Sequence, residues 1–147
     1  MKIIKLTLFF ICFLFTAFIS AEELGQLSVE QLIAMQKQEN ALIIDIRTEN
    51  EWKTTGIIPD SHKLQFFSVT GKYDTAKWLS DLNQLKIAPA QNVILVCRTG
   101  SRSGMVGEML AKKMGMKNIY HLSAGIMPWI KAGNKITKDC PTKLACK

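Results

Sequence analysis

The stretch of sequence that decides the fold is residues 93–103, Val93-Ile94-Leu95-Val96-Cys97-Arg98-Thr99-Gly100-Ser101-Arg102-Ser103. Its first four residues are apolar and mostly β-branched, and together with Asn92 they predict a buried strand over 92–96. A helix is expected over 103–114, so the residues between strand and helix must form a tight loop. A strand that leads through a short loop into a helix is the repeating unit of α/β folds, and here it places Cys97 at the carboxyl end of the strand.

Predicted strands and helices also alternate along the rest of the chain. Two capping boxes, which begin at Ser28 and Thr48, pair a hydroxyl residue with a Gln or Glu three positions later and therefore predict helix starts. We expect helices over 28–38, 48–56, 74–85 and 126–131, and further strands over 41–46, 63–67 and 118–122. Alternating strands and helices imply parallel pairing through helical crossovers. The predicted fold is therefore α/β, with a central, mostly parallel sheet of four to five strands and helices on both faces.

The amino terminus differs in composition from the remainder. Residues 1–21 combine a short basic start, an apolar run over 6–19 and a small residue at Ala21, which is typical of a secretory signal peptide cut near that alanine. The alternative is a retained membrane anchor, although the apolar run is shorter than the roughly 20 residues that cross a bilayer. We expect residues 22–135 to form one domain, followed by a tail over 136–147, and we expect the mature protein to be periplasmic or secreted, with no membrane association after cleavage.

The cysteines fit an exported protein. Cys12 would be discarded with the signal peptide, and an odd number then remains, which predicts one disulfide and one free thiol. Cys140 and Cys146 lie close together in the tail, so we expect them to pair. Cys97 would then stay free, as a nucleophile must be.

The charge of the chain favours small anionic partners over nucleic acid. The formal net charge is +7, and loss of the signal peptide with its two lysines would lower it by two. A modest positive charge suits an anionic substrate, although it is also common on domains with no such task. The lysines are scattered without interleaved aromatic residues, which argues against a nucleic-acid partner.

The loop after the strand has the composition of an anion site. Gly100 permits a backbone conformation in which successive N–H groups point toward the cysteine sulfur, and the start of the next helix adds unpaired N–H groups. Arg98 and Arg102 add two positive charges. All of these features favour a thiolate at Cys97. The alternative is that Cys97 is a small buried apolar residue at the end of a strand, which leaves the two arginines that follow it unexplained.

The chain resembles single-domain rhodaneses, the sulfurtransferases that hold sulfur as a cysteine persulfide. The resemblance covers residues 28–131 and follows the family order: Asp45-Ile46-Arg47, then Glu51-Trp52 with Gly56-Ile57-Ile58-Pro59, then the six-residue loop Cys97 to Arg102, then Leu122-Ser123-Ala124-Gly125 with Trp129. It implies a rhodanese-like fold and a two-step transfer. Cys97 takes the outer sulfur of a donor such as thiosulfate and passes it to cyanide, to a thiol or to a protein acceptor.

The resemblance and the residue types together assign the roles at the site. Cys97 is the expected catalytic residue. The expected substrate-binding residues are Arg98, Thr99, Gly100, Ser101 and Arg102, and the expected supporting residues are Asp45, Arg47 and Glu51. The spacing of Arg47 and Glu51 suggests that they pair. The resemblance implies that neither a metal nor an organic cofactor is required. His62 and His121 have no second ligand at metal spacing, so we expect them to be ordinary surface or core histidines.

Two alternative functions stay open at this point. Cysteine-dependent phosphatases and arsenate reductases also hold a thiolate beneath an anion-binding loop, but they place five residues between cysteine and arginine, whereas four separate Cys97 from Arg102. A shorter loop suits one sulfur better than a tetrahedral phosphate. The other alternative is a persulfide carrier or binding module that does not turn over small molecules.

Overall fold

A computed structural model of the chain describes residues 22–138. The expected signal peptide and the expected pairing of Cys140 with Cys146 lie outside the described residues, so both remain predictions. Within residues 22–138, no helix is long and apolar enough to cross a membrane.

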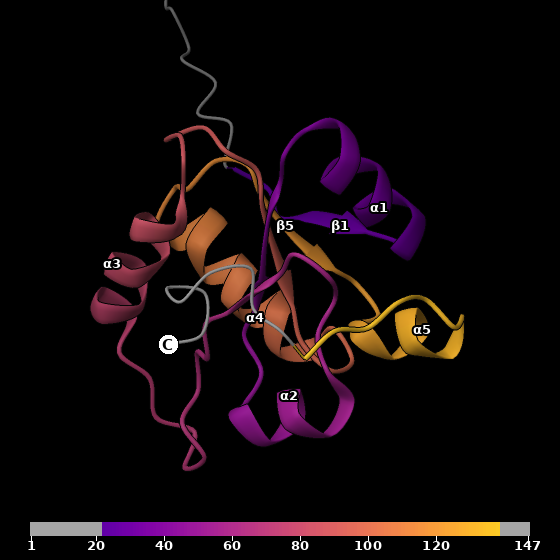
Figure 1. Ribbon diagram of the computed structural model, residues 1–147. Coiled ribbons are helices and arrows are strands. Elements are labelled where there is room, and N and C mark those ends of the chain that lie inside the picture. Colours follow the sequence, from indigo (N-terminus) through magenta and orange to yellow (C-terminus); the bar gives the residue numbers. More distant parts are fainter. Residues whose placement is uncertain (1–21, 139–147) are drawn as a thin grey trace, which may run out of the picture.

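The centre of the fold is a five-stranded sheet in which every neighbouring pair is parallel. Its strands are β1 (Gly25–Leu27), β2 (Leu42–Asp45), β3 (His62–Lys63), β4 (Val93–Val96) and β5 (Ile119–Leu122), in the order β1-β5-β4-β2-β3. The predicted α/β class and the predicted parallel sheet are confirmed. The central strand is β4, which ends at Val96, directly before Cys97. Figure 1 shows β1 beside β5 at one edge of the sheet.

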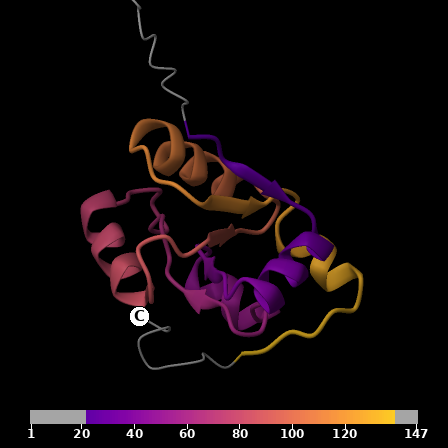
Figure 2. The same ribbon diagram turned by 90° about the horizontal axis from the view of Figure 1, so that it is seen from above.

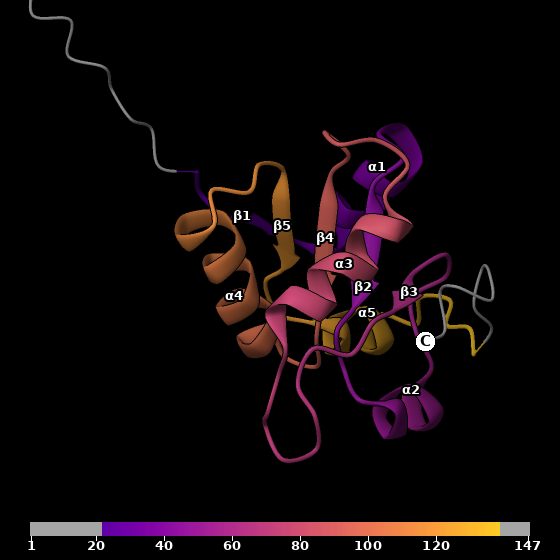
Figure 3. The ribbon, with the colours of Figure 1, turned by 90° about the vertical axis from the view of Figure 1, so that its left-hand side faces the viewer.

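Helices cover both faces of the sheet (Figure 2). They are α1 (Val29–Gln38), α2 (Glu49–Thr55), α3 (Thr75–Leu85), α4 (Ser101–Glu108) and α5 (Ile126–Lys131), and a π-helical segment over Met109–Lys113 extends α4. Both predicted capping boxes are present, at Ser28 and Thr48. In Figure 3, α2 lies below the sheet, at the carboxyl ends of the strands.

The alternation of side chains along β4 divides the core into two layers. Val93, Leu95 and Cys97 pack with side chains from α3, α4 and the π-helical segment. Ile94 and Val96 face the opposite side and pack with side chains from α1 and α5. A strand buried on both faces reads as a continuous apolar run, which explains the sequence of this segment.

The elements differ from the sequence prediction in three places. β1 was not predicted, and β3 is shorter than the predicted strand over 63–67. The helix after Cys97 begins at Ser101 rather than at Ser103, and its last turn is π-helical. The earlier start matters because it brings the amino end of α4 closer to Cys97.

Candidate active site

The sulfur of Cys97 is surrounded by hydrogen-bond donors. Sγ accepts from the backbone N–H of Gly100 at 3.2 Å and from the backbone N–H of Ser103 at 3.3 Å, and the Ser103 hydroxyl oxygen lies 3.3 Å from it. The N–H groups belong to the loop and first turn of α4, where no carbonyl within the helix is available to them. Donors that converge on one sulfur stabilise a negative charge there.

The loop reaches this conformation because residue 100 is glycine. Gly100 has φ +89° and is the N-cap of α4. A β-carbon at this position would overlap the backbone carbonyl of Ser123, so the loop packs directly against the segment that follows β5. Both the backbone angle and the close approach therefore exclude a side chain.

The segment after β5 supports the loop from its other side. At the start of α5, Ile126 donates its backbone N–H to the carbonyl of Cys97 at 2.9 Å, and Met127 donates to the carbonyl of Arg98 at 3.3 Å. A β-carbon on Gly125, which has φ +66°, would overlap the backbone of Arg98. The segment over 123–125, which is among the residues that carry the resemblance, thus supports the loop through its backbone.

Arg102 points to Glu51, which was expected to pair with Arg47. The guanidinium donates to the two carboxylate oxygens of Glu51 at 2.9 Å and 2.5 Å. Burial by itself would raise the pKa of Glu51, but hydrogen bonds from Arg102 and from the backbone and hydroxyl of Thr48 outweigh it and lower that pKa to about 2. The hydrogen bonds that Arg102 donates to Glu51 raise the pKa of Arg102, and the nearby Cys97 acts in the same direction.

Arg47 instead forms a buried ion pair with Asp45. Its guanidinium donates from Nε and Nη2 to the Asp45 carboxylate over 2.7–3.0 Å, and both side chains are 1% exposed. The remaining donors reach the hydroxyl of Thr55 and the carbonyl of Gly56, both at 2.7 Å. The expected pairing of Arg47 with Glu51 is therefore wrong. Arg47 lies two residues after Asp45 at the end of β2, and this spacing allows a bidentate contact between the two side chains. Glu51 on α2 is therefore free to pair with Arg102.

The other residues expected to bind substrate lie on the outer, solvent-facing side of the loop. Arg98, Thr99 and Ser101 are exposed, and Arg102 is half-buried. Cys97 itself is 1% exposed. Cys97 lies at the carboxyl end of its strand, as expected, but its sulfur is closed off from solvent, whereas we expected a nucleophile that is open to solvent. The loop folds over the sulfur because donors can converge on it only by surrounding it.

Two residues at the site were not predicted from the sequence. Ser103 is fully buried and contacts the Cys97 sulfur through both its backbone and its hydroxyl. His121, on β5, is 7% exposed, and its Nδ1 lies 3.3 Å from the Ser103 hydroxyl. Burial lowers the pKa of His121, while a hydrogen bond with the Gly100 backbone and the charge of Glu108 act in the opposite direction.

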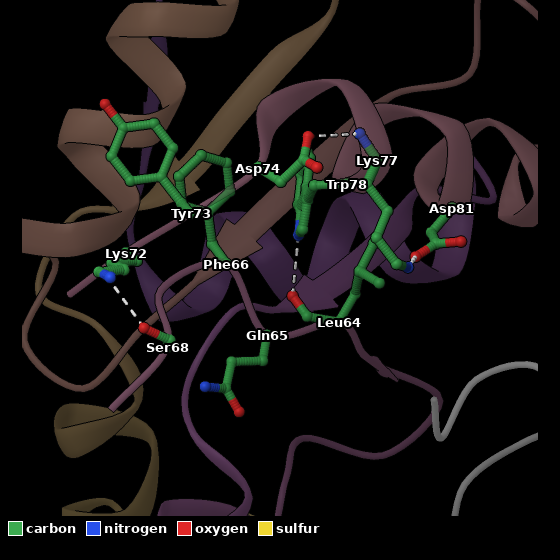
Figure 4. A pocket seen from close by; sticks show the side chains of 10 residues that line it. All are labelled: Leu64, Gln65, Phe66, Ser68, Lys72, Tyr73, Asp74, Lys77, Trp78 and Asp81. Carbon is green, nitrogen blue, oxygen red and sulfur yellow. Dashed lines mark hydrogen bonds and ion pairs between the residues drawn. The ribbon is translucent and has the colours of Figure 1, made fainter. Parts of the chain in front are cut away.

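A pocket of about 320 Å³ lies elsewhere, between α3 and the segment over 64–74 (Figure 4). Phe66, Tyr73 and Trp78 line it, and the Trp78 indole N–H donates to the carbonyl of Leu64 at 3.1 Å. None of its lining residues belongs to the loop over 97–103. The chemistry at Cys97 thus depends on the loop itself and not on this pocket.

Comparisons with known proteins agree with this fold. An uncharacterised protein of Rickettsia prowazekii is 36% identical over 89 residues, which cover 58% of this chain and 69% of that protein. The polysulfide-sulfur transferase of Wolinella succinogenes superposes with a TM-score of 0.58 at 20% identity and covers 78% of each chain. A thiosulfate sulfurtransferase from Pseudomonas aeruginosa superposes with a TM-score of 0.61 at 22% identity over 78% of this chain and 20% of that one.

The family model for the rhodanese-like domain matches residues 28–132, a span that includes all five helices and every strand except β1. Cys97, its loop and the supporting segments at β2 and β5 all lie within that span. The chain therefore belongs to the family of rhodanese-like domains.

Proposed function

We propose that this protein is a sulfurtransferase that moves a sulfane sulfur from a small anionic donor such as thiosulfate to a thiophilic acceptor through a persulfide on Cys97. The observation that supports this most directly is the convergence of the backbone N–H groups of Gly100 and Ser103 on one sulfur, with the Ser103 hydroxyl 3.3 Å from it. Two structural relatives are named as sulfur transferases, which agrees with the proposal.

The first step is a displacement at the outer sulfur of the donor. The Cys97 thiolate attacks that sulfur, a new S–S bond forms, and the S–S bond of thiosulfate breaks. Sulfite leaves with the electron pair of the broken bond, so the charges on the two sides are equal. The persulfide is an anion like the thiolate, and the same kind of donors stabilises it.

In the second step Cys97 is the leaving group instead of the nucleophile. Cyanide or a thiolate attacks the outer sulfur of the persulfide, the bond to Sγ breaks, and its electron pair returns to Cys97. The loop donors stabilise the departing thiolate, which makes Cys97 a good leaving group. With cyanide the product is thiocyanate, and no electrons are gained or lost overall.

Anionic donors are favoured by the charges around the loop. Arg98 is exposed beside Cys97, and Arg102 is 30% exposed although it is paired with Glu51. In our proposal Arg98 and the exposed part of Arg102 hold the sulfonate of thiosulfate while its outer sulfur enters the loop.

The size of the loop favours sulfur over phosphate chemistry. Four residues separate Cys97 from Arg102, one fewer than in the phosphatases, and the N–H groups of Gly100 and Ser103 lie within 3.3 Å of the cysteine sulfur. A phosphatase needs such groups around the phosphate, above the sulfur. This observation favours sulfur transfer over the phosphatase alternative.

The test is incubation of the protein with thiosulfate, mass analysis of Cys97, and measurement of thiocyanate after addition of cyanide. We expect Cys97 to gain the mass of one sulfur atom and thiocyanate to form over many turnovers. Cys97→Ser should abolish both results. The matched control is the double variant Cys140→Ser, Cys146→Ser, which should retain them.

Two outcomes would contradict the proposal. If Cys97 forms a persulfide that cyanide and small thiols do not remove, the protein is a carrier rather than an enzyme. If Cys97 gains no sulfur from thiosulfate or polysulfide in the folded protein, the loop does not perform sulfur transfer.

A further inference from the structure

The Ser103 hydroxyl has three polar neighbours but only one hydrogen to donate. Its Oγ lies 3.3 Å from Cys97 Sγ, 3.1 Å from the carbonyl oxygen of Gly100 and 3.3 Å from His121 Nδ1. Ser103 is fully buried, so these neighbours decide where its hydrogen points. The direction of that hydrogen determines whether the sulfur has a third donor.

The carbonyl of Gly100 already has a donor. The backbone N–H of Gly104 donates to it at 2.8 Å as the first turn of α4 forms. An anionic sulfur gains more from the hydroxyl hydrogen than a neutral carbonyl that is already hydrogen-bonded, because hydrogen bonds to charged groups are the stronger ones. The strongest acceptor for the hydroxyl hydrogen is therefore the Cys97 sulfur.

The role of His121 depends on which of its nitrogens bears the proton. A neutral imidazole has one donor and one acceptor nitrogen. If Nδ1 accepted, it would draw the Ser103 hydrogen away from the sulfur. If Nδ1 donates, it occupies a lone pair of the hydroxyl and leaves the hydrogen for Sγ. The second arrangement satisfies more groups, because Sγ and the Gly100 carbonyl can only accept, and a donor nitrogen also fits the hydrogen bond of His121 with the Gly100 backbone.

We propose that Ser103 and His121 form a positioning pair, in which His121 donates through Nδ1 to the Ser103 hydroxyl and that hydroxyl donates to the Cys97 sulfur. The pair reaches the sulfur from α4 and β5, beneath the loop. This role rests on the proposed function, because it requires that Cys97 reacts as an anionic sulfur. Ser103 touches the reacting atom, whereas His121 acts through Ser103.

The ring of His121 is held in place by its packing. A β-carbon on Gly104 would come within 3.3 Å of the imidazole Cε1, so the helix backbone lies against the ring. The charged groups that act on this arrangement are Glu108, which raises the pKa of His121 against the effect of burial, and Arg102, whose own pKa the nearby Cys97 raises. Because the ring is packed between α4 and the sheet, its Nδ1 has a defined direction toward Ser103.

The test is a titration of the ultraviolet absorbance of the Cys97 thiolate, with the Cys97→Ser protein subtracted as background. Ser103→Ala should move the midpoint of this titration to higher pH by about one to two units, as expected for the loss of one hydrogen bond to a charged group. Ser61→Ala is the matched control, since it removes a buried hydroxyl that donates to Ile58 far from the sulfur, and its midpoint should not move.

The role of His121 is tested by a double-mutant cycle. His121→Leu should move the midpoint in the same direction as Ser103→Ala but by less, and the double variant should match Ser103→Ala alone. His121→Asn, whose amide can place a donor near the position of Nδ1, should restore the midpoint. Thermal unfolding of each variant confirms that folded protein is being titrated.

Two results would overturn the inference. One is an unchanged midpoint in folded Ser103→Ala. The other is a shift caused by His121→Leu that persists when Ser103 is already alanine, which would mean that the histidine acts through another route. The titration contains no sulfur donor, so a failure of sulfur transfer does not affect its outcome.

Discussion

At the scale of single residues, Gly125 sets the distance between the two segments that form the site. We predict that Gly125→Ala removes most of the sulfur-transfer activity, because its β-carbon would push the backbone of Arg98 and the loop away. Gly71→Ala is the matched control: Gly71 also has a positive φ, +77°, but nothing lies within 4 Å of its added carbon. Thiocyanate formation should fall only in the first variant. Equal activity in both would mean that the loop tolerates displacement.

Because of Glu51, the stability of the folded protein depends on pH in the acid range. Its pKa is lowered from 4.5 to about 2 in the folded state, so the folded protein binds fewer protons than the unfolded chain between these values. The contribution of Glu51 is present in full above about pH 4.5 and is lost as the pH falls toward 2.

We therefore predict that Glu51→Gln lowers stability near neutral pH and flattens its fall over this acid range. The measurement is urea unfolding at a series of pH values. Glu49→Gln is the control, since Glu49 is on the same helix but its pair with Lys53 is exposed. An unchanged acid slope in Glu51→Gln would contradict the assignment.

The residues predicted from the sequence are those whose roles follow from local spacing. Cys97 and Gly100 are identified because a strand, a short loop and a helix follow one another within a few positions. Ser103 and His121 are 18 residues apart, and their contact depends on how α4 packs against β5. No local pattern encodes that packing, so a lone histidine gave no indication of it.

At the scale of elements, the buried pair of Asp45 and Arg47 joins the end of β2 to the end of α2. We predict that Arg47→Met lowers the free energy of unfolding by about 3–5 kcal/mol, because it leaves a buried carboxylate without its partner. Replacing both, as Asp45→Leu with Arg47→Met, should cost less than the single change. Urea unfolding measures both variants. A loss below about 1 kcal/mol in Arg47→Met would show that the pair is not needed for the fold.

The helices were predicted more accurately than the strands. Capping boxes at Ser28 and Thr48 fix helix starts through contacts within four residues, and the structure contains both. β1 consists of Gly25, Gln26 and Leu27, which have no apolar alternation, and it exists only because it pairs with β5. Pairing with a distant segment determines whether such residues form a strand, and the sequence around them gives no indication of that pairing.

At the scale of the whole molecule, we propose that the protein acts outside the cytoplasm after removal of residues 1–21. The mature protein should begin near Glu22 and fractionate with exported proteins, which amino-terminal sequencing of the fractionated protein checks. An intact Met1 on membranes would indicate an anchor instead. Residues 22–138 contain the complete sheet and its covering helices, so removal of residues 1–21 should leave thermal stability unchanged.

We also keep the prediction of a disulfide between Cys140 and Cys146. Such a short loop constrains the unfolded chain little, so reduction should change the free energy of unfolding only slightly. Mass spectrometry of protein isolated from its native compartment should find both cysteines oxidised. Two free thiols there would contradict the prediction.

The pairing of β1 with β5 determines when the sheet can close. Gly25 aligns with Tyr120 and Leu27 with Leu122, so the first strand has its only neighbour in the sheet near the other end of the described chain. During synthesis, a nascent chain cannot complete this sheet until the ribosome has passed residue 122. Such long-range pairing also slows folding. In our proposal of export, this delay keeps the newly made polypeptide open for a secretion channel that accepts unfolded chains.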